Sequence, residues 1–270
     1  QSNQDFVIYT ENVYNILIQG NQFNMTNGSN ITVGLEVKNI DNFSCDDCTT
    51  RINIIKNIFA NGCASIVLNS YASELTPVYV YGNTFTGSSV DYNIIGRMIT
   101  GTIKNNNFSS TDTDNPIYLQ QCNPNMFGNV VNGGGTTMIL NGHSYPNLSP
   151  ARTSNTYYWS GGQNMFYSSN AGNINIINAG LPLINYGHNQ FSKNPDQIYF
   201  HITGALDSTV ETYSAAGNAW CTSGANPVNY LYTSGNPYIV TDFSQNYSCN
   251  QLPGVQYSGN LITDIGFGIN

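Results

Sequence analysis

The chain has 270 residues, a formal net charge of −8 and only 8% charged residues, against about 25% in an ordinary globular domain. Seven lysines and arginines stand against 15 acidic residues, which is too few cations to neutralise a nucleic-acid backbone. The apolar runs are only a few residues long, so no segment is predicted to insert into a membrane.

A short apolar strand that runs into an Asn-x-Phe corner is repeated along the chain. Its first copy covers residues 12–23, and a tryptophan replaces the phenylalanine at position 220. The corner phenylalanines Phe59, Phe85 and Phe108 lie 26 and 23 residues apart, a period typical of a solenoid and too short for a propeller blade. We assign these corner asparagines: Asn21, Asn57, Asn83, Asn106, Asn125, Asn164, Asn189 and Asn218.

This repeat predicts an all-β fold, a parallel β-helix (solenoid) of about eight to ten coils. Coils that pair as parallel strands place equivalent residues directly above one another. Inward phenylalanines would then form a stack. A buried amide is costly unless it is hydrogen-bonded, so the asparagines are expected to form an internal ladder in which each bonds the next.

We expect residues 1–270 to form a single β-helix domain. Residues 12–220 hold the regular coils, with one long loop excursion near 128–165, where the spacing of the corners breaks down. Residues 221–270 are expected to form irregular coils or a C-terminal cap. No capping helix precedes the first strand, so we expect the chain to be part of a longer protein.

Aromatic residues gather in the expected excursion, namely Tyr145, Tyr157, Tyr158 and Trp159. Excursions from a solenoid often carry function because the scaffold holds them out. These side chains are candidates for a sugar-binding platform, and the alternative is that they seal the loop onto the solenoid wall.

The strand at residues 78–81 alternates valine and tyrosine. Tyr79 and Tyr81 therefore share one face, and Val78 and Val80 share the other. One face must point outward, so we expect tyrosines along the wall, either as a lateral binding face or as a ladder that stabilises the sheet.

Six cysteines are present, Cys45, Cys48, Cys63, Cys122, Cys221 and Cys249. A zinc site would need a second Cys-x-x-Cys pair besides Cys45 and Cys48, and the sequence has none. Cys249 follows Cys221 by about one coil, as Cys63 follows Cys45 and Cys48, so disulfides Cys221–Cys249 and Cys45 or Cys48 with Cys63 are predicted. They would place the protein outside the cytoplasm; free buried thiols are the alternative.

The corners Gly20-Asn21-Gln22-Phe23 and Gly82-Asn83-Thr84-Phe85 resemble those of right-handed parallel β-helix proteins of the pectate-lyase-like superfamily. The resemblance covers roughly residues 12–220 and is closest to degenerate repeat regions of secreted or cell-surface bacterial proteins. It implies a right-handed coil. Polysaccharide lyases, glycoside hydrolases, phage tailspikes, adhesins and surface filaments all use this scaffold, so the resemblance does not select a function.

Catalytic candidates are weak. Hydrolases of the superfamily carry an Asp-Asp pair and a Gly-His-Gly segment, whereas Asp46-Asp47 lacks that context and residues 141–144 read Asn-Gly-His-Ser. Lyases use a basic residue, and the single basic cluster expected on neighbouring coils is Lys38, Arg51 and Lys56, unless these are ordinary exposed side chains. The three histidines are interpreted as structural or surface residues.

No cofactor is expected. The carboxylates at 46–47 and 112–114 are interpreted as solvated loops, with a calcium site as the alternative. Our first hypothesis is an extracellular or cell-surface domain that acts as an adhesin or carbohydrate-binding module. The alternatives are a polysaccharide lyase or glycoside hydrolase, and a structural stalk or filament subunit that associates end to end.

Overall fold

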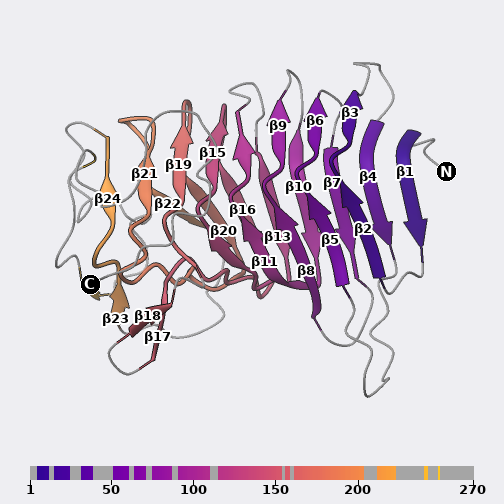
Figure 1. The fold of residues 1–270 in the computed structure, drawn as a ribbon. Coiled ribbons are helices and arrows are strands. Elements are labelled where there is room, and N and C mark those ends of the chain that lie inside the picture. Colours follow the sequence, from indigo (N-terminus) through magenta and orange to yellow (C-terminus); the bar gives the residue numbers. More distant parts are fainter. Residues whose placement is uncertain are drawn as a thin grey trace.

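The computed structural model describes residues 5–11, 15–24, 32–38, 51–60, 64–70, 75–86, 91–109, 115–153, 156–158, 161–203, 212–222, 240–242 and 249. Every regular element in these residues is a β-strand. The strands lie side by side in parallel sheets that follow the chain from one end of the molecule to the other (Figure 1).

Three parallel sheets make up the molecule. Sheet A contains β1 (Asp5–Glu11), β4 (Thr32–Lys38), β7 (Ala64–Asn69), β10 (Tyr92–Arg97), β13 (Ile117–Gln120), β16 (Met138–Asn141), β20 (Ile174–Ile177) and β22 (Phe200–Thr203). Sheet B contains β2 (Asn15–Gln19), β5 (Arg51–Ile55), β8 (Thr76–Tyr81), β11 (Ile99–Lys104) and β14 (Asn125–Phe127). Sheet C contains β3 (Gln22–Asn24), β6 (Ile58–Ala60), β9 (Thr84–Thr86), β12 (Asn107–Phe108), β15 (Val130–Gly133), β19 (Met165–Ser168), β21 (Gln190–Ser192) and β24 (Ala219–Trp220).

The chain visits the sheets in the fixed order B, C, A, and each strand pairs with its equivalent one circuit later. Two short pairs stand apart: β17 (Ala151–Thr153) with β18 (Thr156–Tyr158), which is antiparallel, and β23 (Thr212–Ser214) with β25 (Val240–Asp242), which is parallel. The all-β prediction is confirmed, and the parallel sheets are compatible with a parallel β solenoid.

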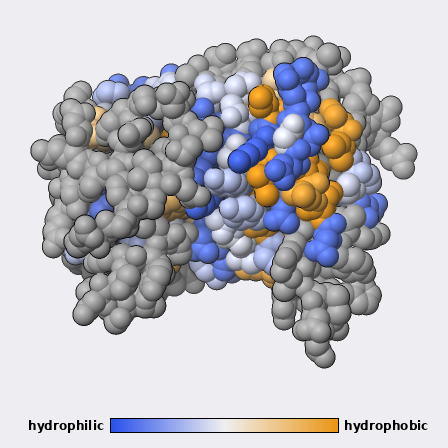
Figure 2. Space-filling model, in the orientation of Figure 1, coloured by the Kyte–Doolittle hydropathy of each residue, from blue (hydrophilic) through white to orange (hydrophobic). Residues whose placement is uncertain are grey.

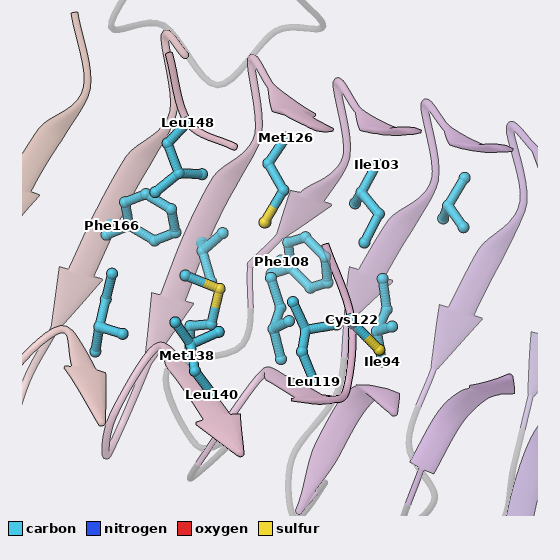
Figure 3. Close-up of a cluster of buried hydrophobic side chains, with 14 of the residues drawn as sticks. Ile94, Ile103, Phe108, Leu119, Cys122, Met126, Met138, Leu140, Leu148 and Phe166 are labelled. Atoms are coloured by element: carbon cyan, nitrogen blue, oxygen red, sulfur yellow. The ribbon is translucent and has the colours of Figure 1, made fainter. Parts of the chain in front are cut away.

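The interior is filled by the apolar side of each strand. In β8, Thr76, Val78 and Val80 are buried, whereas Tyr79 and Tyr81 are half-buried on the opposite face. Equivalent inward residues of successive circuits lie in rows. Figure 3 shows Ile103, Met126 and Leu148 in one such row, with Phe108 and Phe166 beside it.

Phenylalanines of sheet C form stacked pairs. Ring centroids lie 4.6 Å apart in Phe23–Phe59, 5.3 Å in Phe59–Phe85 and 4.5 Å in Phe85–Phe108. Val131, not Phe127, pairs with Phe108 and then with Phe166. Phe127 instead ends a strand of sheet B and is half-buried on its outer side. The corner assigned to residues 125–127 was therefore wrong.

A two-residue corner directly precedes each strand of sheet C. Its first residue has φ between +49° and +69°, in the left-handed region. These residues are Gly20, Lys56, Gly82, Asn105, Gly128, Gln163, His188 and Gly217. An asparagine follows each of them. Glycine and asparagine tolerate the left-handed region best, and they occupy five of these eight positions.

The asparagine of each corner is hydrogen-bonded to the asparagines of the neighbouring circuits. Asn106 Oδ1 accepts from the backbone N–H of Asn83 at 2.9 Å and from its Nδ2 at 3.0 Å. Asn106 Nδ2 donates to Val80 O at 2.9 Å and to Asn129 Oδ1 at 3.0 Å. The same pattern links Asn21, Asn57, Asn83, Asn106, Asn129, Asn164, Asn189 and Asn218.

One residue assigned to this series was wrong. Asn125 points outward from sheet B, where its Oδ1 accepts from Asn147 Nδ2 at 2.9 Å, and Asn129 occupies the buried position. The reason is that the corner requires a left-handed residue directly before the asparagine, and Gly128 provides it. A phenylalanine two residues later is not required, because Val131 fills that space.

A second corner, from sheet A to sheet B, repeats the device with other side chains. Met98, Gln121, His143 and Asn178 have positive φ there. Two of the inward residues that follow accept a backbone hydrogen bond: Ile99 N–H donates to Cys122 Sγ at 3.5 Å, and Cys122 N–H donates to Ser144 Oγ at 3.1 Å. The thiol of Cys122 thus has a structural role here.

The expected excursion at 128–165 is much shorter than predicted. Residues 130–133 and 138–141 remain in sheets C and A. Asn147 forms parallel β-bridges with Asn125 and with Leu183, and Phe127 forms one with Gly162. The chain therefore leaves the coil after Leu148, and the β17–β18 hairpin lies in this insertion. The long gap between Phe127 and Phe166 in the sequence is misleading, because the circuit between them has its buried asparagine at 129 and has Val131 in place of a phenylalanine.

The disulfide prediction is confirmed for one pair, Cys221–Cys249, whose Cα atoms lie 5.3 Å apart. Cys45, Cys48 and Cys63 lie outside the described residues, as does most of the expected cap at 221–270. Cys122 is a free, buried thiol, and burial raises its pKa to about 11. No helix that could cross a bilayer occurs in the part of the chain that the structure describes.

Candidate binding face on sheet B

Aromatic side chains lie on the outer face of sheet B. Tyr79 and Tyr81 are two residues apart in β8, so both point away from the interior. Their rings are stacked, with centroids 5.7 Å apart and planes inclined by 20°. Both remain half-buried, so each ring is supported by neighbours and presents part of its surface to solvent.

A lysine lies between two of the outer aromatic rings. The parallel register aligns Tyr81 with Lys104 of β11, and Lys104 with Phe127 of β14. Lys104 Nζ lies 5.9 Å from the centroid of the Tyr81 ring and 5.4 Å from that of Phe127. An ammonium at this distance is attracted to the ring faces, which keeps the cation and both rings together.

Hydrogen-bonding groups form the neighbouring row of the same face. The register aligns Asn53, Tyr79, Thr102 and Asn125 in successive strands, and all four are half-buried. Asn147 extends the row by donating to Asn125. Amides and hydroxyls thus lie beside the aromatic rings, a combination suited to a ligand that carries both C–H faces and hydroxyl groups.

Exposed apolar residues lie at both ends of this row. Leu17 is aligned with Asn53 and is 63% exposed, and Leu183 bridges Asn147 and is 56% exposed. On the face that Figure 2 shows, hydrophobic residues also lie among hydrophilic ones over the N-terminal half of the molecule. The described part of this face therefore presents mixed apolar and polar surface.

Sheet B carries positive charge in an acidic protein. None of its five strands contains an aspartate or a glutamate. Arg51 begins β5, Lys104 ends β11, and Lys56 lies in the corner directly after β5. These three are among only seven lysines and arginines in the chain.

The aromatic residues predicted as a platform are found in two places. Tyr145 is 44% exposed and its N–H donates to Cys122 O at 3.0 Å, which places it on the outer side two residues before Asn147. Tyr157 and Tyr158 lie on β18, in the hairpin visible below the sheets in Figure 1. Trp159 lies outside the described residues.

The hairpin leaves the coil next to the aromatic row of sheet B. Its strands follow Leu148 and precede Gly162, the residue that bridges Phe127. The base of the hairpin therefore lies in the circuit next to β14.

The basic residues considered for catalysis are not gathered at one point. Arg51 and Lys56 lie at opposite ends of β5, about 16 Å apart along the strand. Lys38 ends a strand of a different sheet, where it pairs with Asn69. A lyase site built from all three has no support in this placement.

The three histidines occupy corner or surface positions. His143 and His188 are left-handed corner residues, and burial lowers the pKa of His188. His201 is exposed on the outer side of β22. Among the described residues, no three His, Cys, Asp or Glu side chains come together as a metal site. The calcium candidates at 46–47 and 112–114 lie outside those residues.

Lys104 and Phe127 are members of this face that the sequence pattern did not indicate as a site. A signal was present, because Thr102 and Lys104 alternate with the apolar Ile103 and so had to face outward. Comparison with protein-family models, with curated proteins and with solved structures finds no match.

Proposed function

We propose that this chain is an extracellular right-handed parallel β-helix domain of about eight to ten coils that binds a polysaccharide along the outer face of sheet B. The observation that carries the proposal is the row of outward aromatic rings, Tyr79, Tyr81 and Phe127, beside outward amides and hydroxyls. Tyrosine offers a large amphipathic contact surface at a low cost in side-chain entropy.

The spacing of these rings suits a polymer. Tyr79 and Tyr81 lie in one strand with ring centroids 5.7 Å apart, and Phe127 lies two strands from Tyr81, about 10 Å across the sheet. The step from Tyr81 to Phe127 follows the direction in which a polymer would cross successive circuits. A rigid sheet holds the rings in place before the ligand arrives, which reduces the entropy lost on binding.

The Cys221–Cys249 disulfide supports an extracellular location, because structural disulfides persist in oxidising compartments. Binding without cleavage is proposed because glycoside hydrolysis needs two carboxyl groups about 5–10 Å apart. The five strands that make the face supply none. The domain would then act as an adhesin or carbohydrate-binding module.

A glycan array followed by calorimetry with the best ligand tests the proposal. We expect Tyr79→Ala and Tyr81→Ala each to weaken binding about tenfold, because each removes one stacking surface of about 1.4 kcal/mol. Tyr118→Ala is the matched control, a half-buried outward tyrosine on sheet A in edge contact with Tyr92. The proposal fails if no glycan binds, if Tyr118→Ala is equally harmful, or if reducing ends appear during incubation.

A further inference from the structure

Charge is distributed unevenly between sheet B and the rest of the molecule. The chain has 15 acidic residues and seven basic ones, yet no strand of sheet B carries an acid. Three of the seven cations belong to the strands and corners of this sheet: Arg51, Lys56 and Lys104. A polyanion would be repelled by most of an acidic protein and directed toward such a strip.

Two of these cations flank one ring of the aromatic row. Lys104 is aligned with Tyr81 from one neighbouring strand, and Ile55 is aligned with it from the other. Lys56 follows Ile55, and its N–H donates to Tyr81 O at 2.9 Å. Lys56 is exposed, and its Cγ lies beside Gly82, the corner residue after Tyr81. The backbones of the two lysines therefore lie about two strand spacings apart, about 10 Å, with the backbone of Tyr81 between them.

We propose that the polysaccharide bound by sheet B is anionic, and that Lys56 and Lys104 bind its charged substituents while Tyr81 stacks on the sugar ring between them. This inference rests on the proposed function and adds the chemical class of the ligand. Each lysine ammonium has three donors and acts as a compact charge, so it suits a carboxylate or sulfate without demanding a bidentate geometry. The rings beside Lys104 displace water around the ammonium, which strengthens its interaction with an anion.

The lysine spacing also predicts the direction of the ligand. Lys56, Tyr81, Lys104 and Phe127 belong to successive circuits, with Lys56 in the corner directly after its strand, so a chain that contacts all of them runs along the solenoid axis, across the strands. A ligand that followed one strand would meet Tyr79 and Tyr81 but only one of the lysines. The charged substituents of the bound polymer should therefore recur at about the spacing of two coils, about 10 Å.

Calorimetry and affinity electrophoresis with three polymers test the inference: hyaluronate, which carries carboxylates; dextran sulfate, which carries sulfates; and neutral dextran. EDTA in the buffer removes metal bridging. We expect binding of at least one polyanion, with an affinity that falls as salt increases, and the ratio of hyaluronate to dextran sulfate binding identifies the substituent. Lys56→Gln and Lys104→Gln should each weaken binding about three- to tenfold.

Arg97→Gln is the matched control, because Arg97 is an exposed cation on sheet A. Its loss should leave the affinity unchanged. Equal losses from Arg97→Gln, or equal binding of duplex DNA, would show non-specific charge attraction and overturn the inference. If neutral glycans bind and the lysine variants match the wild type, the inference fails while the proposed function stands. If no glycan binds at all, both fail.

Discussion

Replacing Asn129 by alanine tests the buried asparagine series most directly. Asn129 Nδ2 donates to Ile103 O and to Asn164 Oδ1, both at 2.8 Å. Its Oδ1 accepts from the N–H and the Nδ2 of Asn106, both at 3.0 Å. The side chain is fully buried, so water cannot replace these bonds. Four lost hydrogen bonds of about 1 kcal/mol each, together with a stranded backbone N–H, predict a loss of about 3–5 kcal/mol in the free energy of unfolding.

Asn125→Ala is the matched control. The two asparagines are four residues apart, but Asn125 is half-buried and makes its contact with Asn147 on the outer surface. We expect its replacement to cost about 0.5–1 kcal/mol. Urea unfolding followed by circular dichroism measures both losses. Hydrogen exchange of the Asn106 amide should accelerate in Asn129→Ala alone.

Two results would refute the role assigned to Asn129. Equal losses in the two variants, or unchanged exchange at the Asn106 amide in Asn129→Ala, would mean that Asn129 does not support the neighbouring circuit. A larger loss of stability in Asn125→Ala than in Asn129→Ala would mean that Asn125 is the buried asparagine, as the Asn-Met-Phe pattern predicted. Asn129→Ser should fall between wild type and alanine because it retains an acceptor.

Three further predictions concern packing, pH and the disulfide. Phe85→Ala removes a fully buried, doubly stacked ring and should cost about 3–5 kcal/mol in urea unfolding, whereas Phe127→Ala on the outer face should cost less than half as much. Burial lowers the pKa of His188 from its ordinary 6.5. The stability that the neutral imidazole contributes is therefore complete above pH 6.5 and is lost as the pH falls through the lowered pKa. In that range, the melting temperature of His188→Asn should depend less on pH than that of the wild type. Reducing Cys221–Cys249, which closes a 28-residue separation, should destabilise the fold by roughly 3–4 kcal/mol, measured by urea unfolding with and without reductant.

The repeat in the sequence was sufficient to predict the fold class, because stacking places like residues above like. It was less reliable for individual corners. The string at 125–127 matches Asn-x-Phe, but the physical requirement is a left-handed residue followed by asparagine, which Gly128 and Asn129 satisfy. The apolar residue two positions later needs only to fill space, so Val131 could serve and remained hidden.

The outward tyrosines were predicted because alternation along one strand is visible in the sequence. The position of Lys104 between Tyr81 and Phe127 was not, because it depends on the register between circuits. Thr76 is aligned with Ile99 and Thr102 with Asn125, both 23 residues apart, whereas Ile52 and Val78 are 26 apart and Ile16 and Ile52 are 36 apart. Because the loops differ in length, the circuits are unequal, and the residues that lie opposite each other on neighbouring strands cannot be worked out from sequence spacing alone.

The two-residue corner between sheets B and C has a consequence for how the scaffold can change. Every described circuit uses the same pair, a left-handed residue and an asparagine, at this junction. Extra residues inside this pair would break the bonded series, so variation in circuit length is absorbed outside it, as in the β17–β18 hairpin, which is inserted between Leu148 and Gly162. Loops can therefore be lengthened, exchanged or grafted elsewhere in a circuit while the bonded asparagines keep the circuits in register. The asparagine column serves as a constant frame, and the rest of each circuit is free to diversify.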